Sequence, residues 1–557
     1  MKRKIIPALI CSVLTLLTGC TEPSNVSLPT VAATTAATAY TVAATTAATT
    51  AETTVTTTTA ATTTTAATTA IAATTTAPWV PPENPAYLDV GDSVEGFEVI
   101  GSAVLGDTHA VQLVHAVTGA RVLLLPEDAK GLTVTLRTPA VSAEGMPGAL
   151  ACIVTRGSEK YTPDDADTFR AHVDTYVDTG RTTFSYTGDP DALLTYADFL
   201  LDGVLHPFVL TDDAAFENAV WHYVLTDDAL SVKGDAYAVM WEQMTLTHTA
   251  QVNLYAALYP GSFRANDPYG TPEYFTDITR ESLSAYHAVY YTPANLLLTV
   301  SGETDYLAFL RYLDTEVLAG YAYKDAALED RWEPLSAPIE VVNEFPVPEG
   351  GEPDAVIDCA YPLDLADETD RDGLMLLAEL ISLPTSKAAE LIGKYLPDAE
   401  VICCVDLTSP TPTFVFHAEG LYESDAALLR QAISAALTGM VADGISADTV
   451  REAAERSREA FLTDTRESLT RYWTGTGDAF GLAEYLKALK DYDSYDADTR
   501  YFEGLIKVYL TGNPVYVLSV TVCAPGKFET HAADLERRLE EIRKGMSGEE
   551  QTSAAED

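Results

Sequence analysis

Basic residues are scarce in this chain. Its 557 residues include 34 Lys and Arg against 82 Asp and Glu, which gives a formal net charge of −48 with neutral histidines. A field of this sign repels polyanions, so we do not expect nucleic acid or anionic lipid as a direct ligand. The acidic residues are spread over the whole folded part, which favours simple solubility of an exported protein over a specific attraction for basic peptides.

Cysteine and histidine motifs are missing as well. The seven cysteines include no C-x-x-C pair, and the five that lie beyond Cys20 are odd in number, so a disulfide framework is not supported and buried free thiols are expected. Cys403 and Cys404 are adjacent, and on a strand they would point to opposite faces. No H-E-x-x-H or H-x-x-E-H occurs, which excludes an intact zinc-peptidase motif of either order.

No hydrophobic run is long enough to span a bilayer. Ile5–Leu17 is apolar behind the basic Lys2–Lys4, but it is shorter than the roughly 20 residues that a transmembrane helix needs. This pattern is typical of a cleaved signal, and Leu17–Cys20 resembles a bacterial lipobox. We predict a lipoprotein signal peptide over residues 1–19 and acylation of Cys20, which anchors the protein by lipid to a membrane of the bacterial cell envelope, outside the cytoplasm. A plain secretory signal with a chance cysteine is the alternative.

Large apolar side chains are nearly absent from residues 20–85. Between Val26 and Ala77 almost every residue is Thr or Ala. Such a segment cannot bury enough surface to offset its ordering entropy, so we expect a disordered tether behind the lipidated Cys20. Thr-rich stalks are often O-glycosylated, a question that composition leaves open.

The rest of the sequence alternates between two hydrophobic periods. Stretches of period two predict strands, and stretches of period 3.6 predict helices. Their order predicts an α+β fold that occurs twice, over residues 86–328 and 329–545, followed by a disordered acidic tail over residues 546–557. The clearest predicted strands are 97–104, 109–117, 121–125, 132–137, 295–301, 356–361, 400–407, 413–418 and 515–522, and the clearest helices are 190–202, 279–290, 374–381, 424–441, 446–461 and 528–542.

Met146–Cys152 and the following Gly157–Tyr161 resemble the zinc-binding region of the insulinase-like (M16) metallopeptidases, in particular the presequence-protease branch. The resemblance extends from Asp89 to Glu541, one half of a full-length presequence-protease-like enzyme. It implies two successive LuxS/M16-peptidase-like (mitochondrial processing peptidase-like) domains, each a mainly antiparallel sheet covered by helices. Further segments that carry it are Thr118–Ala120, Leu136–Pro139, Asp174–Thr179, His206–Phe208, Ala219–Tyr223, Tyr269–Pro272, Tyr290–Asn295, Phe502–Ile506 and Leu510–Pro514.

The same resemblance locates the catalytic positions and shows them altered. In the family, two histidines one helical turn apart and a Glu from a later helix bind Zn²⁺, and a Glu beside the second His activates water. The histidine positions correspond to Gly148 and Cys152, the general base to Ala151 and the third ligand to Val239. Catalytic zinc needs three protein ligands, an open water position and a base. We therefore expect no intact catalytic residue, no bound metal and no cofactor, because the family zinc is lost.

A peptide-binding edge can outlast the metal. Family enzymes hold peptides partly by adding them as a strand to a sheet edge, and the resemblance places that edge at Asp174, Thr175, Tyr176, Val177, Asp178 and Thr179. Strand addition depends on backbone hydrogen bonds rather than on a cofactor. An edge that is simply covered by other parts of the protein is the equally weighted alternative.

The family resemblance also bears on partners. Two half-enzymes normally face each other across a chamber, which implies a homodimer, a second M16-like chain or a monomer with an open face. Our hypothesis is an extracytoplasmic lipoprotein that is catalytically inactive and acts as a peptide-binding or partner subunit. The alternatives are a zinc-dependent metalloendopeptidase with a relocated or partner-supplied site, and a purely structural surface protein.

Overall fold

The computed structural model describes residues 84–555 apart from 107, 127–129, 227–228, 327–329, 408, 410, 464 and 478. The predicted signal peptide, the lipidation site Cys20 and the tether up to residue 83 lie outside the described residues. Within the described part, every helix is too short or too polar to cross a bilayer.

The first half of the described chain builds an eight-stranded sheet. All of its neighbouring strands run antiparallel except β10 and β4, which are parallel. The order across the sheet is β1 (Ser93–Val94), β2 (Phe97–Leu105), β3 (Thr108–His115), β4 (Arg121–Leu125), β10 (Leu297–Ser301), β5 (Gly131–Arg137), β7 (Arg181–Thr187) and β6 (Val173–Val177).

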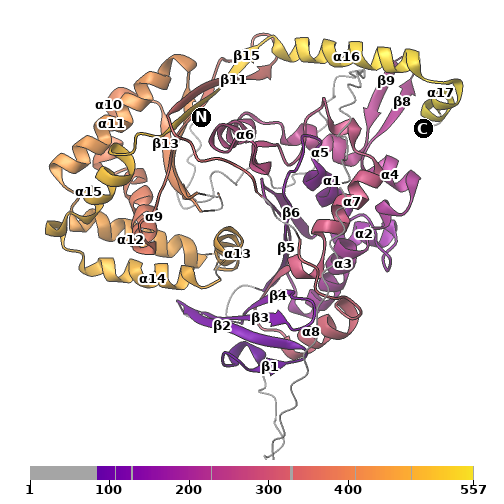
Figure 1. Cartoon of the computed structure of the whole chain (residues 1–557), viewed down its shortest axis with the longest axis horizontal. Coiled ribbons are helices and arrows are strands. Elements are labelled where there is room, and N and C mark those ends of the chain that lie inside the picture. The colour runs from indigo at the N-terminus through magenta and orange to yellow at the C-terminus, as the bar shows by residue number, and fades with distance from the viewer. Residues whose placement is uncertain are drawn as a thin grey trace, which may run out of the picture.

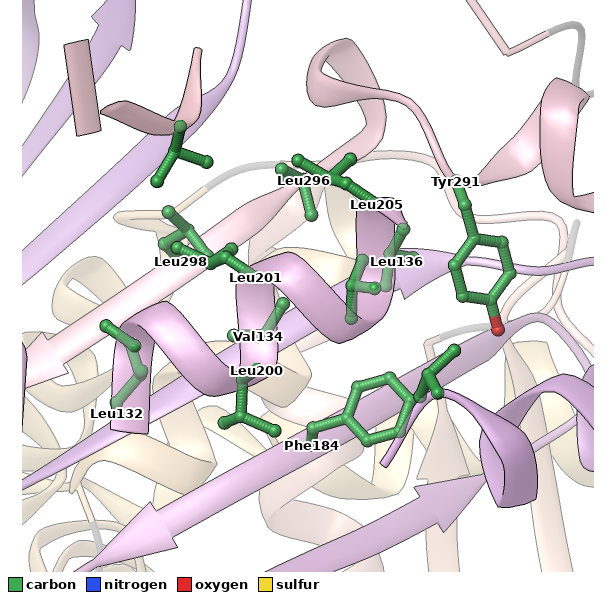
Figure 2. Close-up of a cluster of buried hydrophobic side chains, with 14 of the residues drawn as sticks. Leu132, Val134, Leu136, Phe184, Leu200, Leu201, Leu205, Tyr291, Leu296 and Leu298 are labelled. Atoms are coloured by element: carbon green, nitrogen blue, oxygen red, sulfur yellow. The ribbon is translucent and has the colours of Figure 1, made fainter. Parts of the chain in front are cut away.

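Helices cover one face of this sheet and bury its apolar side chains. Figure 2 shows the centre of the contact, where leucines of α3 (Leu193–Leu205) lie over β5, β7 and β10. The side chains of Leu132, Val134 and Phe184 are all fully buried there. The other helices around this core are α1 (Met146–Ile153), α2 (Pro163–Arg170), α4 (Asp213–Ala219), α5 (Asp235–Gln243), α7 (Arg280–Tyr290) and α8 (Tyr306–Tyr312).

The second half builds a five-stranded sheet with its own helices. The strand order is β11 (Ile339–Val347), β15 (Val517–Pro525), β12 (Ala355–Pro362), β14 (Thr413–Leu421) and β13 (Glu400–Asp406). Its helices are α9 (Glu368–Ser382), α10 (Lys387–Tyr395), α11 (Ala426–Asp443), α12 (Ala447–Thr463), α14 (Gly481–Asp491) and α15 (Tyr501–Leu505). The predicted α+β fold is thus confirmed, whereas the predicted boundaries at residues 86, 329 and 545 stay predictions.

Each half sends a helix to the sheet of the other (Figure 1). Helix α6 (Leu246–Leu258) packs on the second sheet, where Asn253 Nδ2 donates to Thr521 Oγ1 at 3.0 Å. Helix α13 (Thr465–Thr476) packs on the first sheet, where the buried hydroxyls of Thr470 and Thr299 lie 2.9 Å apart. The two sheets are therefore held together by buried contacts in both directions.

The end of the chain is not a disordered tail. We predicted disorder over residues 546–557, and this is wrong for Gly548–Ala555, which form helix α17. Helix α16 (Lys527–Gly545) runs from β15 towards the hairpin of β8 (His222–Thr226) and β9 (Ala229–Lys233), and α17 packs on β8 (Figure 1). Ala554 is buried beside Leu230 and Leu539. The tail is polar in composition, but the small side chain of Ala554 is enough for this close contact. Local composition therefore does not predict helix α17.

Candidate functional site

Helices α1 and α5 lie side by side and carry the four altered positions. Gly148, Ala151 and Cys152 are on α1, whose first turn contains Pro147, and Val239 is on α5. Arg156, just after α1, forms an ion pair with Asp235 in the first turn of α5. Ala151 is buried, and Cys152 and Val239 pack partly buried against the same core. The pairing of the two helices is thus fixed by a shared apolar core and one ion pair.

These four positions offer one metal donor, the thiol of Cys152. Burial raises the pKa of Cys152, and the Arg156 guanidinium, whose Nη2 lies 3.8 Å from the sulfur, acts in the opposite direction. A thiol with a raised pKa is protonated at neutral pH, whereas zinc binds the thiolate. Glu242, the acidic residue three positions after Val239 on α5, is exposed to solvent. Over the described part of the chain, no three or more His, Cys, Asp and Glu side chains are grouped so that they could hold a metal ion. The residues present do not fit the three-ligand site that catalytic zinc requires.

Tyr269 occupies the space beside Gly148. The Gly148 amide donates a hydrogen bond to the Pro268 carbonyl at 2.9 Å. A Cβ atom added at Gly148 would lie 2.7 Å from Tyr269 Cδ1 and 2.9 Å from Tyr269 Cα, which is closer than real Cβ contacts come. Tyr269 itself is 8% exposed. The region where a side chain of residue 148 would project is therefore filled.

Residues 266–270, which we call the cover segment, are held firmly over α1. Asn266 Nδ2 donates to the Ala140 carbonyl at 2.7 Å. His248 Nε2 lies 3.0 Å and 3.1 Å from the two carboxylate oxygens of Asp267, which also accepts from the Tyr269 amide at 2.9 Å. The start of the segment is thus fixed by the side-chain hydrogen bonds of Asn266 and Asp267.

Two glycines permit this close approach. Gly145 has φ +86° and Gly270 has φ +82°, a conformation that side chains disfavour. A Cβ atom at Gly145 would lie 2.3 Å from the Tyr269 carbonyl oxygen, and one at Gly270 would lie 2.3 Å from the Glu144 carbonyl oxygen. Sequence reasoning missed Tyr269. The glycines at 145, 148 and 270 were the available signal, because glycine in two segments is what close backbone contact requires.

The predicted peptide-binding strand is the edge strand β6. Among the described strands it pairs only with β7, and it ends at Val177 rather than at Thr179. The prediction placed Asp178 and Thr179 in the strand, and this is wrong because Asp178 Oδ1 accepts the amides of Gly180 and Arg181, both at 3.0 Å, and closes a turn. Asp174, Thr175 and Tyr176 do lie in the strand, as predicted.

The ladder geometry shows which peptide groups of β6 face outward. The Asp178 amide donates to the Arg181 carbonyl at 3.0 Å, so the hydrogen-bonded pairs fall on the even-numbered residues of β6. In an antiparallel ladder the alternate residues point their N–H and C=O groups away from the partner strand. Val173, Thr175 and Val177 therefore direct their peptide groups to the open side of the sheet.

The cover segment and the edge strand have α1 as a common neighbour. Burial raises the pKa of Tyr269, as do the nearby Tyr176 and Asp267, whereas the Val177 backbone acts in the opposite direction. Helix α1 contacts both β6 and the cover segment.

Charged side chains lie near Tyr176 of β6. The Arg181 guanidinium is 5.5 Å from the ring centroid of Tyr176 and forms an ion pair with Asp178 at 2.5 Å. Arg471 on α13 pairs with Glu467 at 2.9 Å. Burial raises the pKa of Tyr176, as does Asp178, whereas Arg181 and Arg471 act in the opposite direction.

The chain is similar to M16-type and presequence proteases. A family model described as the peptidase M16 inactive domain matches residues 277–456. Protein HypA of Clostridium perfringens is 24% identical over 486 residues, covering 80% of this chain and 49% of that protein. Presequence protease 1, chloroplastic/mitochondrial, of Arabidopsis thaliana is 24% identical over 515 residues, covering 84% and 47%. The chain therefore spans about half the length of these curated relatives.

A solved structure shares the fold at low identity. The crystal structure of the periplasmic protease PqqL from Escherichia coli superposes with a TM-score of 0.53 and 13% sequence identity. The match covers 81% of this chain and 49% of that chain. A match of this extent includes both sheets and the helices that cover them.

Proposed function

The chain belongs to the M16 peptidase family, in its presequence-protease branch, and from that premise we propose that it is a non-catalytic member that binds peptides or a partner subunit. Its two sheet-and-helix halves are two M16-like domains. The observation that carries the proposal is the state of the altered positions. They offer one protonated thiol as a donor, and Tyr269 fills the space beside Gly148. Without three ligands and a base, a zinc-bound water cannot be held or activated.

Peptide binding is supported by the open edge of β6. The outward peptide groups of Val173 and Thr175 can donate to and accept from an added strand, which is how extended peptides bind to many sheet edges. Strand β6 has 5 residues. At a rise of about 3.3 Å per residue, an added strand can therefore pair with it over a short length only. Its affinity therefore depends on the few backbone hydrogen bonds that it offers.

A location outside the cytoplasm completes the proposal. The lipobox-like Leu17–Cys20 and the Thr/Ala-rich residues 20–85 support a lipid anchor at Cys20 with a tether that lifts the domains off the membrane. Similarity to a periplasmic protease supports the same compartment. The net charge of −48 favours solubility there.

The partner we propose is a second M16-like chain or a second copy of this one. The relatives are about twice as long as the matched region, so they contain a further segment of similar size. A partner that supplied such a segment would take the place of the further segment that these relatives contain. Size-exclusion chromatography with light scattering, with and without a candidate second chain, separates the homodimer from the hetero-complex.

Metal content tests the non-catalytic proposal. Protein purified without chelator should contain far less than one zinc per chain by mass spectrometry of the metals, because only Cys152 is a donor at the altered positions. A fluorogenic peptide mixture should show no chelator-sensitive cleavage. An M16 peptidase with an intact motif, purified and assayed in parallel, is the control. Stoichiometric zinc together with cleavage that stops on chelation would overturn the proposal and favour a relocated site.

A further inference from the structure

A cavity of about 390 Å³ lies in the helical layer of the first domain. It is lined by the end of α3, by the loop between α1 and α2 and by the turn that follows α8. The side chains of Leu201, Leu205 and Val317 are buried and make part of its lining apolar. Small-molecule sites have volumes of about 300–1,000 Å³, so the cavity has room for a long amino-acid side chain.

The turn that follows α8 is π-helical, and this shapes the cavity. The Leu318 amide donates to the Leu313 carbonyl at 2.8 Å, which is a hydrogen bond over five residues instead of four. The wider turn lets Glu316 and Val317, which follow Tyr312 by four and five positions, line the same cavity as Tyr312. Single π-helical turns are frequent at functional sites.

Lys160 lines the cavity, but its charge is balanced by Asp198, which does not. Lys160 Nζ lies 2.6 Å from Asp198 Oδ1, which also accepts from the Tyr312 hydroxyl at 2.6 Å. The Tyr161 hydroxyl donates to Asp198 Oδ2 at 2.8 Å. Burial alone would raise the pKa of Asp198, but these three hydrogen bonds outweigh it and lower the pKa. The ammonium group of Lys160 therefore does not neutralise the rest of the cavity.

Three carboxylates line the cavity, those of Glu159, Asp202 and Glu316. Asp202 is 7% exposed, and its Oδ2 accepts from the Lys160 amide at 2.9 Å. Among the described residues, nothing donates to Asp202 Oδ1, and no Lys or Arg forms an ion pair with any of the three carboxylates. A buried carboxylate without a cationic partner is unfavourable, so the cavity favours a positively charged ligand.

We propose that this cavity binds the side chain of an arginine or lysine from a peptide. The cationic group pairs with Asp202, and the aliphatic stem packs against Leu201 and Leu205, because long basic side chains place their stems on apolar surface. Within the described part of the chain, no group of side chains could hold a metal ion, so an organic cation suits the cavity better. The lining residues lie outside β6, and only the origin of the ligand, a peptide, rests on the proposed function.

Binding of single blocked amino acids tests the site, because one residue is too short to add to β6 as a strand. The probe is acetyl-arginine methylamide, and its control is the citrulline analogue, which has the same length and no charge. Titration of the full-length chain, followed by saturation-transfer NMR, should give a dissociation constant on the order of 1 mM for the arginine probe. The citrulline probe should bind about 10-fold more weakly, because it loses a hydrogen bond between charged groups. Equal binding of the two probes would overturn the proposal.

Variants at the carboxylates locate the bound probe. Asp202→Asn should weaken binding of the arginine probe by about 10-fold, and its amide oxygen can still accept from the Lys160 amide. The double variant Glu159→Gln with Glu316→Gln changes two exposed side chains and should weaken it by about 5-fold. Glu303→Gln, at an exposed residue outside the lining, is the matched control and should leave it unchanged. Melting temperatures show whether each variant remains folded.

The outcomes separate this site from the proposed peptide binding. If Asp202→Asn does not fold, the double variant alone decides. Arginine binding that the folded carboxylate variants leave unchanged would lie elsewhere and would overturn the inference. A neutral peptide that binds while the arginine probe does not would also overturn it, and strand addition at β6 would stand.

Discussion

Replacing His417 by Gln is expected to destabilise the protein by about 3–5 kcal/mol, the cost of leaving a buried charge without its partner. His417 on β14 lies opposite Asp358 on β12, with 2.7 Å between Nδ1 and Oδ1, and both side chains are buried. The second ring nitrogen is 3.3 Å from Glu419 Oε1, which also accepts from Thr247 of α6. Gln cannot carry the positive charge that balances Asp358, so the carboxylate must be neutralised or exposed when the protein folds.

Urea unfolding of the full-length chain measures this effect. The double variant Asp358→Asn with His417→Gln removes both charges and should recover most of the lost stability, because two neutral amides can hydrogen-bond to each other. His531→Gln, at an exposed histidine, should leave the unfolding free energy within about 0.5 kcal/mol of the wild type. A single His417→Gln variant as stable as the wild type would show that the pair is not charged.

The same pair makes stability depend on pH. Burial lowers the pKa of His417, but attraction to Asp358 and hydrogen bonds to Asp358 and Glu419 outweigh it and raise the pKa to about 10. The folded value lies above the unfolded value of about 6.5, so the contribution to stability is complete below about pH 6.5 and is lost as the pH rises towards about 10. The unfolding free energy of the wild type should fall across that interval, and the double variant should show a smaller fall.

Gly148→Ala is expected to destabilise the protein by about 1–3 kcal/mol, although Ala is the better helix former. The new methyl group would lie 2.7 Å from the Tyr269 ring and 2.9 Å from Tyr269 Cα, so backbone has to shift. Gly393 in α10 is the matched control. It is an exposed helical glycine with no atom within 4 Å of the Cβ position, and Gly393→Ala should stabilise by about 0.5–1 kcal/mol. Denaturant unfolding of both variants compares the signs directly, and a stabilised Gly148→Ala protein would disprove the close packing.

The packing at Gly148 also decides whether the family motif can be rebuilt. The combined variant Gly148→His, Ala151→Glu, Cys152→His and Val239→Glu restores the donors but needs space that the cover segment occupies. We expect it to be less stable than the wild type and to bind no stoichiometric zinc. Adding Tyr269→Gly should not suffice, because the Pro268 carbonyl oxygen remains 3.1 Å from the Cβ position at residue 148. Zinc analysis of the folded fraction checks both statements, and tight zinc binding by either variant would contradict them.

Much of the fold was predictable from hydrophobic periods. The strand predicted over residues 400–407 is β13 (Glu400–Asp406), and the helix predicted over residues 279–290 is α7. Cys403 and Cys404 point to opposite faces, as predicted, since Cys403 lies in the core of the second domain and Cys404 packs towards α6. These elements are determined by side chains close in sequence, which a local period reflects.

Features that depend on distant segments were not predictable. The family resemblance placed a strand at Asp174–Thr179, but its end at Val177 depends on the Asp178 carboxylate turning back to its own backbone. Tyr269 appeared only within a segment that resembles the family, and its contact with Gly148 requires knowledge of how residues 144–148 and 266–270 meet. Helix α17 has too little apolar surface for a local signal, and it is ordered by the hairpin on which it packs.

The return of the C-terminal helices to the β8–β9 hairpin has a consequence for synthesis. Leu230 on β9 is buried by Leu539 and Ala554, which the ribosome adds only after all strands of the second sheet. Nascent domains generally fold as they emerge, but here the first domain leaves the ribosome with one apolar surface still uncovered. Until α16 and α17 are synthesised, that surface is open to chaperones and proteases. The maturation of the first domain is thus timed by the completion of the second.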